Sequence, residues 1–329
     1  MSAELSALGQ GIVSGDRRAL ARAITLVESN RAEDAEPALA LLAELFPQQR
    51  RGMRVGISGP PGVGKSSLLE RLGMQLVAEG RRPAVLVVDP SSQRGGGSIL
   101  GDKTRMLELG RQSSAYVRPS PSGEQSGGIA RATGDVLLLC DVAGYDPLFV
   151  ETVGVGQAES AVTSVVDVLL LLLEPGAGDE LQGLKRGLTE WGDVIAVNKT
   201  DGPRAELAGR TATEFAAALS ARRSTAEPPP SVLTLSALEN VGIDRLWSEL
   251  SHRYAALAAS GQLEHRRQAQ RRAEFRRRLH GELWRAFTGD AARANELEEL
   301  ERRVAAGELL AGRAVRTTIE RFFGTLEPP

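Results

Sequence analysis

A glycine-rich motif near the start of the chain has the residue types needed to hold a polyphosphate. Residues 59–66 read GPPGVGKS, which fits the pattern G-x-x-x-x-G-K-[ST]. Glycines allow backbone N–H groups to face phosphate oxygens, the lysine adds a charge at the β and γ phosphates, and the serine hydroxyl suits Mg²⁺. An apolar strand pattern precedes the motif and a helical pattern follows it, as this type of site requires. The predicted contacts are Gly59, Pro61, Gly62, Val63, Gly64, Lys65, Ser66 and Ser67.

A second motif, NKTD at residues 198–201, has the residue types that select guanine. A buried carboxylate can accept from the N1–H and N2 amine of guanine, and adenine has no such donor pair. We assign this role to Asp201, with Asn198 holding the loop and the Lys199 stem covering the base. Ser236, Ala237 and Leu238 follow a later strand pattern, and a backbone N–H of this loop is expected at the guanine carbonyl. The two motifs together predict binding of GTP and GDP.

Two acidic residues compete for the position near Mg²⁺. Asp141 lies in an apolar stretch followed by Ala-Gly, whereas Glu151 lies in LFVETVG, the same pattern with Glu in place of Asp. Only four residues separate Asp141 from the strand predicted to begin at Asp146, and parallel strands cannot be joined by so short a connection. Residues 129–143 are therefore predicted to form the crossover helix, with Asp141 at a solvated helix end. The geometry favours Glu151 in the site, with the Gly154 N–H sensing the γ-phosphate.

The elements that must position these motifs are short runs rich in Val, Ile and Leu, separated by amphipathic stretches. They read as buried parallel strands with helical crossovers, which predicts an α/β P-loop domain with a doubly wound, mostly parallel sheet. The predicted strands are 54–58, 84–89, 146–151, 166–173, 193–198 and 232–235. We divide the chain into an N-terminal helical extension (1–50), the nucleotide-binding domain (51–260) and a helical arm (261–329).

Helical periodicity and charge distinguish the last part of the chain. Residues 261–280 are rich in arginine, and a charge run of this kind is usually a solvated helix face. An apolar stripe at helical spacing predicts that this arm mediates self-association. The stripe consists of Phe275, Leu279, Leu283 and Phe287, and then of Leu297, Leu300 and Val304.

Composition excludes several classes of protein. The 329 residues carry a formal net charge of −2, which gives no global basic excess for nucleic acid or an anionic membrane. The single cysteine, Cys140, cannot form an internal disulfide and suits a reducing compartment. No apolar run is long enough to cross a bilayer and the N-terminus lacks a signal-peptide pattern. We expect a cytoplasmic protein without membrane or nucleic-acid partners.

Two loops combine glycines with charged residues at predicted strand ends. Residues 89–106 (DPSSQRGGGSILGDKTRM) contain Asp89 and Asp102, which are candidate Mg²⁺-associated residues. The same segment is equally compatible with a loop followed by a helix cap at Ser98. Residues 175–185 (PGAGDELQGLK) follow another strand, on the edge where open α/β sheets bind ligands.

These segments in order, together with ETVGVGQAE at 151–159, resemble the MeaB-type G-protein chaperones of methylmalonyl-CoA mutase. The resemblance implies a SIMIBI-class P-loop GTPase that hydrolyses GTP slowly, forms homodimers through its C-terminal helices, and gates loading of adenosylcobalamin into an acyl-CoA mutase. It implies Mg²⁺ beside Ser66, with Asp89, Asp102 and Glu151 on the associated acidic positions. It also places Asp179, Glu180 and Lys185 on a switch that couples nucleotide state to the mutase. The chain departs from the family pattern between Pro119 and Gly128.

The sequence alone leaves open the identity of the partner mutase and some other functions of a GTPase. Methylmalonyl-CoA mutase is the default partner, with isobutyryl-CoA or hydroxyisobutyryl-CoA mutase as alternatives. A nickel-insertion GTPase shares the domain class, but its Cys/His sites have no counterpart here before His252. A GTP-binding scaffold without turnover is a further alternative, because no arginine finger or catalytic glutamine stands out. Gln157, near the second switch, is a candidate for orienting the attacking water.

Overall fold

The computed structural model describes residues 3–89, 106–121, 128–152, 162–176, 192–221 and 230–323. Backbone contacts divide the chain into one unit of residues 1–270 and a second of residues 271–329. Within the described residues, no helix is both long and apolar enough to cross a membrane.

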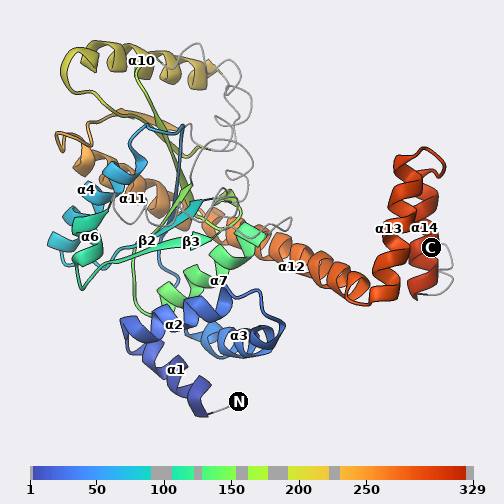
Figure 1. Ribbon diagram of the computed structural model, residues 1–329. Helices are drawn as coiled ribbons and strands as arrows, with labels where there is room; N and C mark the ends of the chain where they lie inside the picture. The colour runs from blue at the N-terminus through green and yellow to red at the C-terminus, as the bar shows by residue number, and fades with distance from the viewer. Residues whose placement is uncertain are drawn as a thin grey trace. The chain divides into compact units, whose positions relative to one another are not determined.

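A seven-stranded sheet forms the centre of the first unit, and each neighbouring pair of its described strands is parallel (Figure 1). The order across the sheet is β3-β2-β4-β1-β5-β6-β7, with β1 in the middle. The strands are Arg54–Ser58 (β1), Ala84–Asp89 (β2), Tyr116–Pro121 (β3), Leu148–Thr152 (β4), Val168–Leu173 (β5), Val194–Val197 (β6) and Ser231–Thr234 (β7). Six of these match the sequence prediction within a few residues, and β3 was missed.

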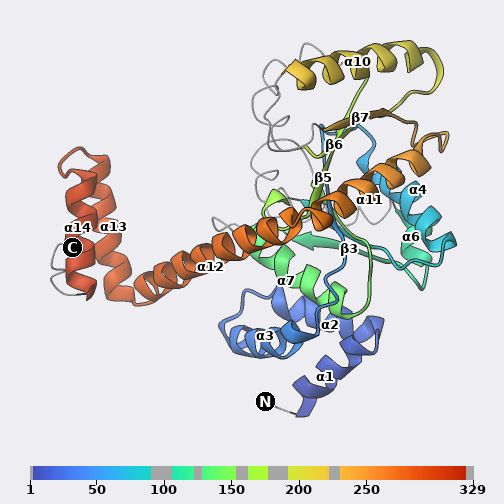
Figure 2. The same ribbon diagram turned by 180° about the vertical axis from the view of Figure 1, so that it is seen from behind.

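The helices cover both faces of the sheet, and the strands are apolar on both faces as a result (Figures 1 and 2). Along β4, Phe149 belongs to one core and Leu148 and Val150 to the other. Up to residue 260, the described helices are Ala3–Val13 (α1), Arg17–Val27 (α2), Ala32–Leu45 (α3), Phe46–Gln48 (η1), Lys65–Ala78 (α4), Leu107–Arg111 (α6), Gly128–Val142 (α7), Gly202–Arg204 (η3), Ala205–Ala221 (α10) and Ile243–Ala259 (α11).

One core layer packs beneath α4, α6 and α11, and the other lies between the sheet and α7 together with α1, α2 and α3. Leu68, Leu72 and Leu76 of α4 are fully buried at helical spacing, so this helix presents one apolar face to the sheet. Cys140 of α7 is fully buried, and burial raises the pKa of its thiol, so it behaves as a small apolar residue. A third, smaller core joins α10 to the strands β5 and β6.

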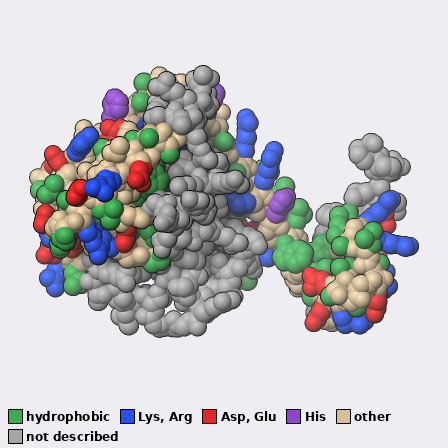
Figure 3. All heavy atoms as spheres, turned by 90° about the horizontal axis from the view of Figure 1, so that it is seen from above, with side chains coloured by type: hydrophobic (Ala, Val, Ile, Leu, Met, Phe, Trp, Pro, Cys, Tyr) green, Lys and Arg blue, Asp and Glu red, His purple; other side chains and the backbone are tan. Residues whose placement is uncertain are grey.

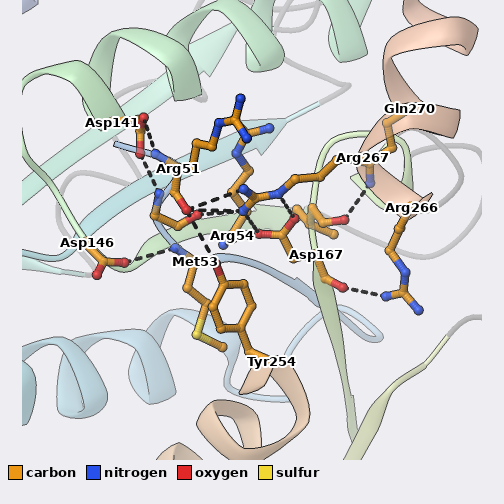
Figure 4. A network of polar contacts seen from close by, with 12 residues as sticks. Arg51, Met53, Arg54, Asp141, Asp146, Asp167, Tyr254, Arg266, Arg267 and Gln270 are labelled. Carbon is orange, nitrogen blue, oxygen red and sulfur yellow. Dashed lines mark hydrogen bonds and ion pairs between the residues drawn. The ribbon is translucent and has the colours of Figure 1, made fainter. Parts of the chain in front are cut away.

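Asp141 lies in α7, as predicted, but the expectation of a solvated helix end is wrong (Figure 4). Its carboxylate is fully buried and accepts the N–H groups of Arg50, Arg51 and Gly52 at 2.7, 3.0 and 2.7 Å. These donors precede β1, at the amino-terminal edge of the sheet. Asp141 therefore holds the chain where it enters the central strand.

The arginine-rich stretch also begins differently from the prediction. Helix α12 spans Gln262–Thr288, and two of its first residues are held by aspartates rather than by solvent. Arg267 donates to both carboxylate oxygens of Asp167, at 2.8 and 2.7 Å, and Asp167 is fully buried (Figure 4). Burial lowers the pKa of Arg267, but the hydrogen bonds and charge of Asp167 outweigh it and raise this pKa. Arg266 pairs with Asp193 at 2.9 Å.

The second unit continues α12 and adds Ala291–Ala305 (α13) and Ala311–Phe323 (α14). Asp290 caps α13 by accepting the N–H groups of Ala292 and Arg293, at 2.9 and 3.1 Å. An ion pair between Glu296 and Arg321 links α13 to α14.

Candidate functional site

The phosphate-binding motif forms the loop between the end of β1 and the start of α4, and two of its glycines are required by close contacts. Gly64 has φ +97°, and a Cβ there would lie 2.5 Å from Nδ2 of Asn198. A Cβ on Gly59 would lie 2.2 Å from the carbonyl oxygen of Leu172 in β5. Any side chain at these positions would displace a neighbouring strand end, so the loop has its shape only with glycine.

Lys65 is held inside this loop. Its side chain is buried, and Nζ donates to the carbonyl oxygens of Gly59 at 2.7 Å and Pro60 at 3.1 Å. The residue is also the first of α4, where the helix dipole and the backbone N–H groups favour an anion. An ammonium group and a helix N-terminus therefore meet where the loop would enclose a phosphate.

Glu151 reaches the same loop from the neighbouring strand. Its strand β4 pairs in parallel with β1, and Glu151 is in register with Ile57. Ser66 donates its hydroxyl hydrogen to Oε1 of Glu151 at 2.8 Å, and Glu151 is buried. A serine hydroxyl and a carboxylate are hard oxygen donors of the kind that Mg²⁺ prefers, so these two residues fit that ion.

Asn198 connects the phosphate loop to the base-reading segments. Its Nδ2 donates to the carbonyl oxygen of Val63 at 2.8 Å, and its Oδ1 accepts the N–H of Ala237 at 3.0 Å. The side chain is almost fully buried, so both hydrogen bonds form away from water. One amide thereby fixes the loop after β7 relative to the loop after β1.

Asp201 is oriented by the loop after β7. The Ser236 hydroxyl donates to Oδ1 of Asp201 at 2.7 Å, and the same hydroxyl accepts the N–H of Glu239 at 3.1 Å. Lys199 has φ +62° and forms an ion pair with Glu174 at 2.6 Å. The carboxylate that would read guanine and the lysine that would cover it are thus both oriented by neighbouring side chains.

A cavity of about 560 Å³ brings these segments together. Its volume lies within the roughly 300–1,000 Å³ typical of small-molecule sites. It extends from the phosphate loop to the two base-reading loops, and also along the outer face of α4 to α6. The lining residues are Gly62, Gly64, Ser67, Glu70, Arg71, Leu107, Glu108, Asn198, Lys199, Asp201, Ala237 and Leu238.

The structure describes the phosphate and base motifs but only part of the predicted switches. Asp89 ends β2, next to β4, and its side chain is not among those described. Six predicted residues lie outside the described residues, namely Asp102, Gly154, Gln157, Asp179, Glu180 and Lys185. The sequence prediction missed Glu174 as the partner of Lys199, and it gave the Ser236 side chain no role. The position of Glu174 directly after β5, at the carboxyl edge of the sheet, was an available signal.

Comparisons with known proteins agree with this geometry. A family model described as "Methylmalonyl Co-A mutase-associated GTPase MeaB" matches residues 20–292. A putative GTPase of Caulobacter vibrioides is 46% identical over 321 residues, which cover 97% of this chain and 98% of the relative. The mitochondrial methylmalonic aciduria type A homolog of Mus musculus is 41% identical over 323 residues, covering 95% and 78%.

A solved structure is similar to this chain in fold as well as in sequence. The crystal structure of a LAO/AO transport system kinase superposes with a TM-score of 0.77 at 33% identity, and the match covers 98% of each chain. The predicted α/β fold of the P-loop type is confirmed by this match and by the parallel sheet.

Proposed function

Since this chain belongs to the MeaB family of methylmalonyl Co-A mutase-associated GTPases, we propose that it gates adenosylcobalamin loading and protection in an acyl-CoA mutase. GTPase activity itself is the activity of the family. The dependence on Mg²⁺, the link to cobalamin and the identity of the mutase belong to the proposal. Methylmalonyl-CoA mutase is the expected partner because the family description names it and the mouse relative is named for methylmalonic aciduria. Isobutyryl-CoA and hydroxyisobutyryl-CoA mutases are the alternatives.

The hydrogen bond between Ser66 and Glu151 carries the mechanistic part of the proposal. It joins the first turn of α4 to the end of β4, directly before the segment predicted as the second switch. In this proposal Ser66 and Glu151 hold Mg²⁺, which supplies positive charge to the β and γ phosphates when bound. A loss of the γ-phosphate would then change the surroundings of Glu151 and of the chain that follows it.

The remaining roles follow from chemistry at the same loop. Lys65 and the backbone N–H groups stabilise negative charge on the transferred phosphoryl group, while attack by water occurs in line with the leaving oxygen. Asp201 selects guanine, with Asn198 fixing its loop. The proposal keeps the other predicted switch and metal residues in their roles, namely Asp89, Asp102, Gly154, Gln157, Asp179, Glu180 and Lys185.

We also propose that the C-terminal arm forms a homodimer contact. Phe275, Leu279 and Leu283 follow one another at four-residue spacing on α12, and their exposed fractions are 67%, 44% and 42%. Figure 3 shows hydrophobic side chains exposed among the charged ones on this part of the chain. A stripe of this kind on a single helix is stabilised when a second helix covers it. The proposed setting is the cytoplasm, which suits the one cysteine, Cys140.

Steady-state phosphate release from GTP tests the proposal. The purified chain is assayed alone and with an adenosylcobalamin-dependent methylmalonyl-CoA mutase, with and without Mg²⁺, and with ATP as the control nucleotide. We expect slow, Mg²⁺-dependent turnover of GTP that rises when the mutase is added. Turnover without any response to methylmalonyl-CoA mutase would contradict this choice of partner, and the other two mutases would then be assayed.

Two variants separate the roles within the site. Lys65→Ala should abolish turnover, and unchanged hydrolysis would refute the assignment of the phosphate loop. Glu151→Gln keeps the shape of the side chain but removes its charge, so it should raise the Mg²⁺ concentration needed for half-maximal rate. An unchanged Mg²⁺ requirement would exclude Glu151 from the metal site.

A further inference from the structure

The cavity has a wall that belongs to neither nucleotide motif. Glu70 and Arg71 of α4 and Leu107 and Glu108 of α6 line it, together with the motif residues. In the proposed function, the base motif would anchor one end of a guanine nucleotide and the phosphate loop the other. The part of the ligand between these ends is the ribose and the α-phosphate, so a wall of the same cavity is available to contact it.

This wall is held firmly against the helix that follows the phosphate loop. Glu70 accepts the N–H of Glu108 at 2.8 Å and that of Leu109 at 3.4 Å. At Gly73 an added Cβ would lie 2.5 Å from a methyl carbon of Leu109, so α6 packs on α4 where α4 has no side chain. The N-terminal residues of α6 are thereby fixed relative to α4, and hence relative to the phosphate loop.

Arg71 supplies a cation on this wall. It lies four residues after Ser67, on the same face of α4, and helix side chains lean toward the N-terminus of their helix. Phosphate oxygens would lie at the first turn of α4, so the lean of this side chain favours a contact between the Arg71 guanidinium and a phosphate. Arg71 is exposed, and within the described part of the chain it forms no ion pair, although Glu70 and Glu108 line the same cavity. A guanidinium with its donors available is suited to a phosphate.

We propose that Glu108 binds the ribose hydroxyls of the guanine nucleotide and that Arg71 binds its α-phosphate. A carboxylate accepts hydrogen bonds from hydroxyl groups, whereas a guanidinium donates them to phosphate oxygens. Glu70 is a positioning residue because it acts through the backbone of Glu108. The inference rests on the proposed function in one respect, namely that the nucleotide occupies this cavity. It makes the wall of α4 and α6 a third recognition element, in which Glu108 recognises the ribose and Arg71 the α-phosphate.

Binding of GDP and 2′,3′-dideoxy-GDP to the full chain, measured by titration calorimetry, tests this inference. Glu108→Ala should weaken GDP about tenfold, the lower end of the range expected for a hydrogen bond to a charged group. The same variant should bind dideoxy-GDP as the wild type does, because that ligand has no hydroxyls to lose. Equal losses for both ligands, or no loss for either, would overturn the role of Glu108.

The Arg71 arm has a matched control in Arg111, an exposed arginine of α6 outside the cavity lining. Arg71→Met should weaken GDP and dideoxy-GDP alike, by about tenfold, whereas Arg111→Met should leave both unchanged. Equal affinities of the two variants would overturn the role of Arg71. Asp201→Ala distinguishes this failure from that of the proposed function. If Asp201→Ala binds GDP as tightly as the wild type does, the nucleotide site itself is misassigned.

Discussion

Replacing Arg267 by methionine should lower the free energy of unfolding by about 3–5 kcal/mol, the cost of removing one partner of a buried ion pair. The exposed fractions of the two side chains are 8% for Arg267 and 0% for Asp167, so water cannot replace the lost partner. Methionine retains most of the aliphatic stem but none of the five hydrogen bonds, which are two to Asp167, one to the carbonyl oxygen of Gly52 at 2.9 Å and two longer ones to the carbonyl oxygen of Arg51 at 3.4 and 3.5 Å. The Asp167 carboxylate would keep the N–H of Arg54, at 2.9 Å.

Urea unfolding followed by circular dichroism and by tryptophan fluorescence measures this change, and linear extrapolation gives the free energy. Arg272→Met is the control, because Arg272 is exposed on the same helix and forms no hydrogen bond or ion pair through its side chain within the described residues. It should change the free energy by no more than about 0.5 kcal/mol. Affinity for GDP should be unchanged, since the ion pair lies at the opposite edge of the sheet from the phosphate loop. Equal effects of the two substitutions would refute the reasoning.

Three further predictions concern the site and the core. Gly64→Ala should abolish nucleotide binding in a GDP titration, because φ is +97° and the new Cβ would lie 2.5 Å from the Asn198 amide; retained affinity would contradict the loop geometry. Asp201→Asn should weaken GTP by at least tenfold and favour XTP in competition binding, since xanthine offers an acceptor where guanine has its N2 amine; unchanged preference would exclude Asp201 from base reading. Burial raises the pKa of Tyr116 to about 12, so the folded state holds this proton more tightly than the unfolded chain. The contribution of Tyr116 to the free energy of unfolding should be fully present below pH about 10 and should fall between pH about 10 and 12, by up to about 1.4 kcal/mol per pH unit. In urea unfolding at a series of pH values, Tyr116→Phe should show a shallower fall of this free energy than the wild type. An equal slope in the two proteins would contradict the raised pKa.

The strands that hold the site could be predicted from the sequence because they are continuous apolar runs. Strand β3 could not be predicted in this way. It contains Pro119 and Pro121, and proline cannot donate to a sheet ladder. The structure explains its presence, because β3 lies at the edge of the described sheet and pairs there with β2. A strand in that position needs only one hydrogen-bonded neighbour, so its sequence need not resemble that of a central strand.

Topology was more informative than motif resemblance for the acidic residue. Asp141 fits the commoner pattern, but the connection after it is too short to join two parallel strands, and the residue lies in the helix α7 instead. What could not be predicted was its burial, because its three donors come from Arg50 to Gly52, about ninety residues earlier in the chain.

Arg266 and Arg267 illustrate the same limit at the other end of the chain. Their partners, Asp193 and Asp167, precede β6 and β5, and only the folded sheet brings them to α12. Local sequence contains the charge of an arginine but not the position of its counterion. The pairing of Ser236 with Asp201 is of the same kind, because the two residues belong to different loops.

The two hydrogen bonds of Asn198 bear on the kinetics of nucleotide exchange. Its amide joins the loop after β1 to the loop after β7 through contacts within the protein, so the fold itself holds the two loops together and their ordering adds little to the entropic cost of binding a nucleotide. After GDP dissociates, the loops at the two ends of the cleft keep their spacing. The cleft therefore keeps the dimensions that the next GTP requires. A factor that accelerates GDP release at these loops would have to separate them, and the Asn198 amide is the link it must break.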